Sequence, residues 1–214
     1  GISTMGVAVK FCGITTVRDA LDAVAAGCSA IGLNFYENSR RRVSLASSET
    51  IIGRIGREVK IVAVFVDPEV EEVVPVVEKL HVDYLQFHGD EPAKFCEQFQ
   101  VPYLKAQSVV EGFDFEEFSD NYHRATALML DSSTDRERGG TGTTFDWTLW
   151  PTSTTRKIIL AGGLDATNVA QAIKSTNPWA VDVASGIEKG AGPAKDVQKM
   201  EAFMRGVRRV GTKS

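Results

Sequence analysis

Two residues of the sequence have side chains that can give and take protons, and each stands at the end of an apolar stretch. Cys12 follows Lys10 by two positions and precedes Gly13, and Asp131 directly follows the apolar residues 127–130. A nearby cation lowers the pKa of a thiol and makes it a usable base. Partial burial raises the pKa of a carboxyl, so that it can donate a proton near neutral pH. The two residue types indicate acid–base chemistry, although each alone also fits a buried structural thiol or a loop anchor.

Two glycine-containing turns indicate a binding site for an anion. Gly162-Gly163 and Ser185-Gly186 each follow an apolar stretch late in the chain. Glycine allows backbone N–H groups to approach a phosphate closely, and a helix N-terminus adds favourable potential. Such glycines can also serve only to make tight turns, but two of them in consecutive turns favour phosphate binding.

Three consecutive arginines form a further candidate. Arg40, Arg41 and Arg42 could lie in a solvated loop, but a guanidinium group also suits two-point recognition of a carboxylate. The sequence does not decide which of the three would make that contact. His88 follows another apolar stretch, and its residue type alone assigns it no role.

A repeated pattern of elements must position these residues. Eight apolar runs of strand length occur, at residues 7–11, 30–35, 61–66, 84–87, 103–106, 127–130, 158–161 and 180–183. Most of them are near-continuous Val, Ile, Leu, Ala or Phe without strict alternation. That pattern is typical of strands that are covered on both faces, as in a parallel sheet.

Segments with helical patterns separate the strands. They are predicted at residues 16–26, 47–55, 69–80, 92–98, 115–122, 167–175 and 194–207, with a shorter helix around Phe145-Asp146-Trp147. In the first of them we expect Thr16 to cap the helix, Asp19 to face water and Leu21 to face inward.

Alternating strands and helices predict an α/β fold with a parallel sheet inside and helices outside. Eight such units in 214 residues favour closure into a (β/α)8 TIM barrel over an open doubly wound sheet. The turn Cys12-Gly13-Ile14-Thr15 lacks the Gly-x-Gly-x-x-Gly pattern of dinucleotide-binding sheets. We expect a single domain over residues 5–210, with residues 1–4 left over from expression. In this barrel the active site lies at the carboxyl ends of the strands, where all the candidate residues fall.

Composition limits the classes of function. The formal net charge of −4 argues against nucleic-acid binding, which requires a basic surface. The three cysteines form no Cys-x-x-Cys pair and the three histidines lack metal-ligand spacing, so we expect no metal site and no disulfide framework. Neither a signal peptide nor a membrane span is evident, and a reducing cytoplasm fits this composition.

In combination, these stretches resemble the phosphoribosylanthranilate isomerase family from about residue 9 to about residue 203. The stretches that carry the resemblance are KFCGIT (10–15), GLNFY (32–36) with SRR (39–41), VAVFV (62–66), QFHGDE (86–91), GTG (140–142) with FDW (145–147), LAGGL (160–164) with NV (168–169) and DVASGIE (182–188). Each stretch is a weak signal, but all of them in order are specific.

The resemblance implies a cofactor-free isomerase of tryptophan biosynthesis. Its reaction is the Amadori rearrangement of N-(5′-phosphoribosyl)anthranilate to 1-(2-carboxyphenylamino)-1-deoxyribulose 5-phosphate. By resemblance, Cys12 is the general base, Asp131 is the general acid and Arg41 meets the anthranilate carboxylate. Gly162, Gly163, Ser185 and Gly186 bind the phosphate, and His88, Gly142 and Asp182 complete the substrate-binding residues. The resemblance implies a small phosphorylated molecule as the partner, no nucleic acid and no membrane, in a monomer or a homodimer.

Two positions depart from the family pattern. Members usually have proline and tyrosine around the matched arginine, where this chain has Arg40 and Arg42, so the choice of arginine stays open. Ala184 replaces the first of two usual serines, which keeps a backbone N–H for the phosphate but removes a hydroxyl.

Other functions remain as alternatives. A histidine-pathway isomerase on the same fold performs the same rearrangement, but it typically uses two aspartates and two phosphate sites, whereas this chain has Cys12 on the first strand. A non-catalytic barrel that binds a phosphorylated ligand would be indicated by loss of the acid or the base, and both Cys12 and Asp131 are present. RNA binding through residues 40–42 and 136–138 is disfavoured by the acidic total and the lack of interleaved aromatic residues.

Overall fold

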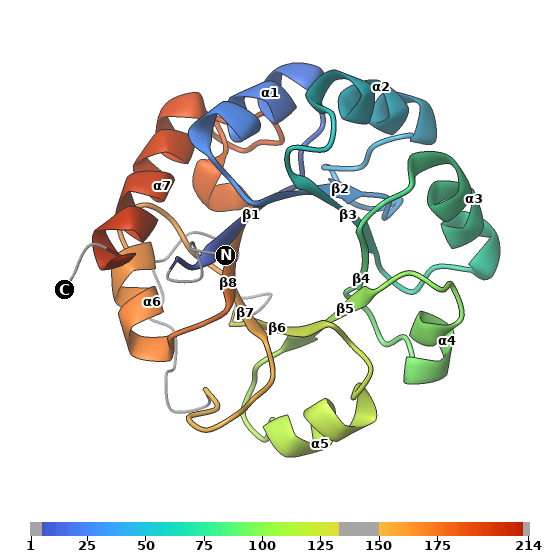
Figure 1. The fold of residues 1–214 in the computed structure, drawn as a ribbon, viewed down its shortest axis with the longest axis vertical. Helices are drawn as coiled ribbons and strands as arrows, with labels where there is room; N and C mark the ends of the chain where they lie inside the picture. Colours follow the sequence, from blue (N-terminus) through green and yellow to red (C-terminus); the bar gives the residue numbers. More distant parts are fainter. Residues whose placement is uncertain (1–5, 133–149, 212–214) are drawn as a thin grey trace.

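The apolar runs form parallel strands that close into a ring in the computed structural model, which describes residues 6–132 and 150–211. The strands are β1 (Ala8–Cys12), β2 (Ala30–Asn34), β3 (Lys60–Phe65), β4 (Tyr84–Phe87), β5 (Tyr103–Ser108), β6 (Ala127–Asp131), β7 (Ile158–Ala161) and β8 (Ala180–Val183). Each strand pairs in parallel with the next, and β8 pairs with β1 to close the barrel (Figure 1). The predicted TIM barrel is confirmed.

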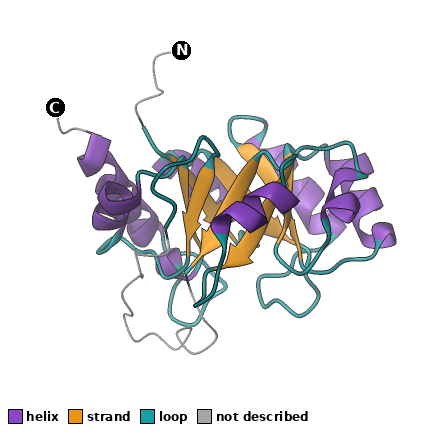
Figure 2. Ribbon diagram, turned by 90° about the horizontal axis from the view of Figure 1, so that it is seen from below, coloured by secondary structure: helices purple, strands orange, loops and turns teal. Residues whose placement is uncertain are grey.

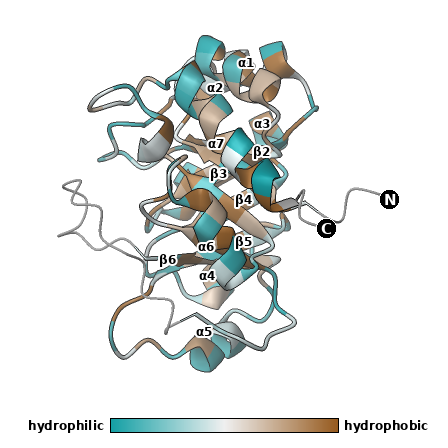
Figure 3. Ribbon diagram, turned by 90° about the vertical axis from the view of Figure 1, so that its left-hand side faces the viewer, coloured by the Kyte–Doolittle hydropathy of each residue, from teal (hydrophilic) through white to brown (hydrophobic). Residues whose placement is uncertain are grey.

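Helices cover the outside of the ring. They are α1 (Val17–Ala26), α2 (Leu45–Ile55), α3 (Val70–Leu80), α4 (Ala93–Glu97), α5 (Phe115–Asn121), α6 (Val169–Thr176) and α7 (Val197–Gly211), and a 3₁₀ helix, η2 (Ser185–Ile187), follows β8. Figure 2 shows the strands as the central layer with helices around them, and in Figure 3 hydrophilic residues gather on the outer helices. Within the described residues, no helix is both long and apolar enough to cross a bilayer.

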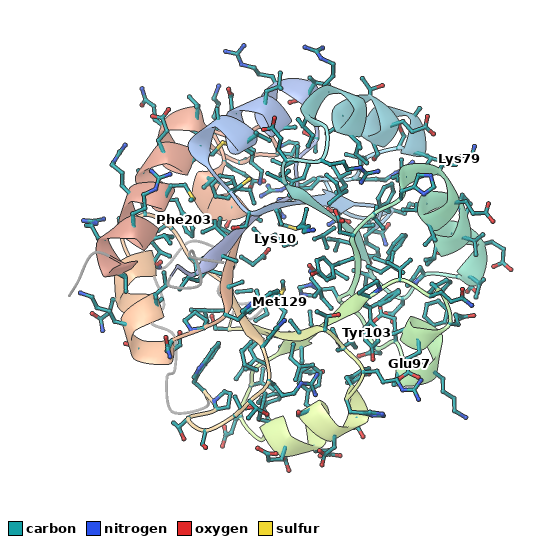
Figure 4. All side chains as sticks on the ribbon, in the orientation of Figure 1. Lys10, Lys79, Glu97, Tyr103, Met129 and Phe203 are labelled. Carbon is teal, nitrogen blue, oxygen red and sulfur yellow. The ribbon has the colours of Figure 1, made fainter. Side chains whose placement is uncertain are left out.

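Side chains along each strand alternate between the barrel interior and the layer under the helices. In β1, Phe11 belongs to the outer layer and meets Phe203 of α7 with ring centroids 6.1 Å apart. Lys10 and Cys12, two positions apart, share the opposite, inner side. Figure 4 shows Lys10 and Met129 inside the ring of strands. The inner layer therefore carries polar groups from β1 toward the mouth of the barrel.

The predicted elements are observed with small shifts in their bounds. Thr16 caps α1 as expected, because its side chain accepts a hydrogen bond from the N–H of Asp19. Helix α2 begins at Leu45, two residues before the prediction, because Ser44 forms a capping box with Ser47. The last helix begins at Val197 instead of residue 194, because Lys195 forms a β-bridge with Glu188. The short helix predicted around Phe145-Asp146-Trp147 lies outside the described residues.

The predicted facing of two residues of α1 is wrong. Asp19, expected to face water, is buried, and its carboxylate accepts a hydrogen bond from the backbone N–H of Lys195 at 3.0 Å. Leu21, expected to face inward, is 37% exposed. The segment that precedes α7 packs over this part of α1, so a polar residue finds a buried partner there.

Candidate active site

All strands run in the same direction, so their carboxyl ends open onto one mouth of the barrel. Cys12 is the last residue of β1 and Asp131 is the last residue of β6. On the shorter way around the ring, β8 and β7 lie between these two strands. Each of the two residues is 9% exposed. The structure therefore brings both predicted proton-transfer residues to the same end of the barrel.

A buried ion pair lies beneath Cys12. The Lys10 ammonium is 2.8 Å from the Asp182 carboxylate, and the two residues are register partners on β1 and β8. Burial lowers the pKa of Lys10, but attraction from Asp182 and Cys12 outweighs burial and holds that pKa above its ordinary value. Lys10 therefore carries its positive charge inside the barrel.

Gly32 of β2 leaves the space that Cys12 and Lys10 occupy. A Cβ at position 32 would lie 2.6 Å from the Cys12 Sγ and 3.1 Å from the Lys10 Nζ. Cys12 and Gly32 are register partners across β1 and β2. Thiol and ammonium thus approach the same bare stretch of backbone.

Arg41, in the loop between β2 and α2, forms a two-point ion pair with Glu188. Its Nε lies 2.7 Å from Oε2 and its Nη2 lies 2.8 Å from Oε1. Arg40 reaches the same carboxylate only at 3.5 Å, and its side chain is 53% exposed. Gly13, with φ +82°, lies directly under the Arg41 side chain, where a Cβ would collide with it. Of these two arginines, Arg41 is the one held over the end of β1.

Glu188 also binds Lys195, so the ion pair is part of a buried network. The Lys195 Nζ lies 3.3 Å from Glu188 and donates hydrogen bonds to the carbonyl oxygens of Cys12 at 2.7 Å and Ala184 at 3.0 Å. Burial raises the pKa of Glu188, but Arg41 and Lys195 more than compensate, so the pKa lies below its ordinary value. Burial lowers the pKa of Lys195 despite Glu188. The network ties the backbone at the ends of β1 and β8 together.

His88 stands beside Asp131, the other residue predicted to transfer a proton. Its Nε2 lies 3.4 Å from the Asp131 carboxylate, and its Nδ1 lies 3.3 Å from the Nε2 of Gln86, a buried residue of β4. The loop that carries His88 is held from below, because Glu91 accepts hydrogen bonds from the N–H of Gly89 at 2.9 and 3.1 Å. His88 is therefore fixed close to Asp131 at the mouth.

The two predicted glycine turns lie against each other. Gly162 and Gly163 have φ values of +100° and +69°, which favour glycine. At position 186 a Cβ would collide with the carbonyl oxygen of Leu164, so the turn after β7 touches η2 directly. The N–H groups of Ser185 and Gly186 precede the first bond of η2, which Ile187 donates to Ala184. N–H groups at the start of a helical turn have no partner within that turn, and such groups are suited to binding an anion.

Proteins of known function are similar to this chain over nearly its whole length. The sequence profile of the N-(5′-phosphoribosyl)anthranilate isomerase family matches residues 9–206. The chain belongs to this family. An N-(5′-phosphoribosyl)anthranilate isomerase of Nitrosospira multiformis is 46% identical over 203 residues, which are 95% of this chain and 97% of the relative.

Solved structures of phosphoribosylanthranilate isomerases have the same fold. The crystal structure of the Thermotoga maritima enzyme has a TM-score of 0.86 and 36% identity, covering 95% of this chain and 99% of that one. A phosphoribosylanthranilate isomerase in complex with reduced 1-(o-carboxyphenylamino)-1-deoxyribulose 5-phosphate has a TM-score of 0.80 and 32% identity, with coverage of 95% and 99%. The isomerase function and the place in tryptophan biosynthesis implied by the resemblance are confirmed.

Most of the residues expected from this isomerase family meet at the mouth. The described candidates there are Cys12, Asp131, Arg41, His88, Asp182, Gly162, Gly163, Ser185 and Gly186. Gly142 lies outside the described residues. Among the residues that the structure describes, no group of three His, Cys, Asp or Glu side chains could hold a metal ion.

The sequence prediction of the isomerase site missed two buried charged residues, Glu188 and Lys195, and it named Lys10 beside Cys12 without its buried partner Asp182. Lys10, Glu188 and Lys195 are at most 4% exposed, and each connects the end of β1 to another part of the mouth. A lysine within an apolar strand and a glutamate after a buried one are signals for such a role, because charged residues are rarely buried without partners.

Proposed function

We propose that this chain isomerises N-(5′-phosphoribosyl)anthranilate with Cys12 as the general base and Asp131 as the general acid. The single observation that carries the proposal is the position of these two residues, which end β1 and β6 at one mouth of the barrel. An isomerisation that moves a proton between neighbouring carbons needs one donor and one acceptor on a held substrate.

In the proposed sequence of steps, Asp131 and Cys12 each give up one proton and take up one proton. Asp131 donates its proton to the ribose ring oxygen, the bond between this oxygen and C1′ breaks, and the anilino nitrogen lone pair forms a Schiff base. The Cys12 thiolate then removes the proton on C2′, and the C–H electron pair moves toward C1′ to give an enolamine. The enolamine tautomerises to the ketone, which returns both protein groups to their starting states.

The surrounding residues would hold the substrate at its two ends. Arg41, fixed by Glu188, is the arginine best placed to meet the anthranilate carboxylate. The turns at 162–163 and 185–186 would bind the phosphate through backbone N–H groups. We assign His88 and Asp182 to the substrate-binding residues as well, with Gly142 outside the described part. Binding of the carboxylate and the phosphate, which lie at opposite ends of the substrate, would position the reacting carbons between Asp131 and Cys12.

Several finer expectations complete the proposal. The chain would act without a cofactor or metal, in the cytoplasm, and without binding nucleic acid. A structure of monomers generated from the dimeric Thermotoga maritima isomerase supports a homodimer or a monomer as the working state.

Loss of anthranilate-type fluorescence on adding freshly made substrate tests the proposal. We expect rapid loss with the parent protein and very little with Cys12→Ala or Asp131→Asn, while circular dichroism shows that the variants are folded. Near-normal turnover in either variant would remove that residue from the mechanism. If the folded parent protein bound the substrate without converting it, the chain would be a non-catalytic barrel that binds a phosphorylated ligand. If it converted only the histidine-pathway substrate, it would belong to that pathway.

A further inference from the structure

We propose that Lys10 is a positioning residue for the general base: its ammonium, clamped by Asp182 over the bare backbone of Gly32, holds Cys12 as a thiolate. This inference rests on the proposed role of Cys12 as the base. It assigns Asp182 a structural task in addition to any contact with substrate.

The position of Lys10 is determined by its neighbours in the barrel. Lys10 and Cys12 are two positions apart on β1, so both side chains point into the interior. Lys10 is 4% exposed, and its Nζ lies 2.8 Å from Asp182 on the adjacent strand. A buried lysine that pairs with a buried carboxylate is held in one conformation, whereas a lysine exposed to solvent samples many rotamers.

Gly32 brings the ammonium and the thiol together. Since one point, the missing Cβ of Gly32, lies 2.6 Å from the Cys12 Sγ and 3.1 Å from the Lys10 Nζ, the two groups share one small space. Their separation is below ~6 Å, the range in which opposite charges strongly favour each other's charged form. Burial strengthens this interaction, because little water screens it.

Cationic side chains outnumber carboxylates around Cys12. Among the described residues, the charged side chains that gather around it are Lys10, Arg41 and Lys195, with the carboxylates Asp182 and Glu188 as their partners. Arg40 also reaches Glu188, but it is half-exposed and solvent screens it. Three cations against two carboxylates leave one positive charge close to the sulfur.

Lys10 is the cation in this group with the most direct effect on the sulfur. Arg41 is engaged through two nitrogens with Glu188. Lys195 donates to the backbone oxygen of Cys12, so it holds the main chain and not the sulfur. Removal of the Lys10 charge should therefore change the ionisation of Cys12 while the other two contacts persist.

The remaining cysteines provide a built-in control. Cys28 and Cys96 are buried, and burial raises the pKa of each thiol to about 12. Thiols with so high a pKa stay largely protonated up to about pH 10, so alkylation below that pH reports mainly Cys12.

The test is the pH dependence of Cys12 alkylation by iodoacetamide in the folded protein, with the modified residue identified by mass spectrometry. We expect Lys10→Met to move the pH midpoint upward by at least about one unit, which is a tenfold loss of reactivity near neutral pH. The ascending limb of the kcat profile should move by the same amount, with KM little changed. An unchanged midpoint would overturn the inference.

In Lys10→Met the buried Asp182 carboxylate loses its partner, and the protein could misfold for that reason alone. A second pair of variants controls for this effect. Asp182→Asn and the double variant Lys10→Met with Asp182→Asn differ only at Lys10, and neither leaves a buried carboxylate alone. A higher midpoint in the double variant supports the inference, and equal midpoints contradict it. Alkylation needs no substrate, so a shifted midpoint in a protein without isomerase turnover would refute the proposed function and leave the role of Lys10 intact.

Discussion

Arg41 and Glu188 meet through both donors on one side of the guanidinium, with contacts of 2.7 and 2.8 Å, although 147 residues separate them in the chain. A two-point contact fixes the plane of the guanidinium as well as its position. Arg40 makes a single longer contact and is half-exposed. The remaining N–H groups of Arg41 therefore point in one direction, and in the proposed function they meet the carboxylate of the substrate.

We predict that Arg41→Gln raises KM for the natural substrate by about 10- to 100-fold, because hydrogen bonds to charged groups contribute about 1.5–3 kcal/mol. The matched variant Arg40→Gln should change KM by less than about threefold, since exposed ion pairs contribute little. Steady-state kinetics with a substrate analogue lacking the carboxylate completes the test. On that analogue Arg41→Gln and the parent should have the same KM, and a large difference would disprove the contact.

We predict that the free energy of unfolding falls less steeply toward acidic pH in Glu188→Gln than in the parent protein. The folded pKa of Glu188 lies below its ordinary value because Arg41 and Lys195 stabilise the carboxylate against burial. Its contribution is therefore complete above the unfolded pKa of about 4.3 and is lost as the pH falls through the folded pKa. Urea unfolding from pH 7 to pH 3 should show a free energy about 3–5 kcal/mol lower for the variant at neutral pH, with the two proteins converging in acid. Parallel curves would contradict the prediction.

Gly32→Ala should lower kcat by about tenfold or more with a small effect on KM. Its Cβ would lie 2.6 Å from the Cys12 Sγ and 3.2 Å from the Cys12 Cα, so the base must move away from its place. Gly53→Ala is the matched control, because a Cβ at this helical glycine meets nothing within 4 Å. The measurement is kcat of Gly32→Ala and of Gly53→Ala at saturating substrate. Equal kcat values in the two variants would show that the position of Cys12 is not critical.

Gly186→Ala should weaken binding of the phosphate end. The new methyl would collide with the carbonyl oxygen of Leu164, which pushes η2 away from the turn after β7. In the proposed phosphate site both turns present N–H groups to one anion, so we expect KM to rise by about tenfold. Inhibition by inorganic phosphate should weaken in parallel. Unaltered inhibition in a folded variant would place the phosphate elsewhere.

We predict a bell-shaped dependence of kcat on pH for the parent protein. The proposed mechanism requires Cys12 without its proton and Asp131 with one, so activity should fall on both sides of an optimum. The measurement is turnover in a constant-ionic-strength buffer series. A flat profile between about pH 6 and 9 would count against this pair of residues.

The strands and the mouth of the barrel could be predicted because their signals are local or follow from topology. Buried parallel strands are continuous apolar runs, and once eight of them close, the residues at their ends must meet. Cys12 and Asp131 were found in this way, as were the turns at 162–163 and 185–186.

Residues whose role depends on a distant partner were beyond such prediction. Asp19 was assigned to the water-facing side of α1, but it is buried against the N–H of Lys195, 176 residues later. Lys10 and Glu188 lie within the motifs at residues 10–15 and 182–188, yet their pairing with Asp182 and Arg41 depends on which strands adjoin and which loops fold over them. Helix periodicity and residue type contain no information on these neighbours.

The closure of the ring between β1 and β8 also determines when the enzyme can first work during its synthesis. The strand that carries Cys12 is made first, but Asp182, which holds Lys10 beneath it, follows 172 residues later. At typical rates of translation that interval is about 10–30 s. Every nascent chain shorter than this lacks Asp182 and β8, so the surroundings of Cys12 cannot be complete before the end of translation.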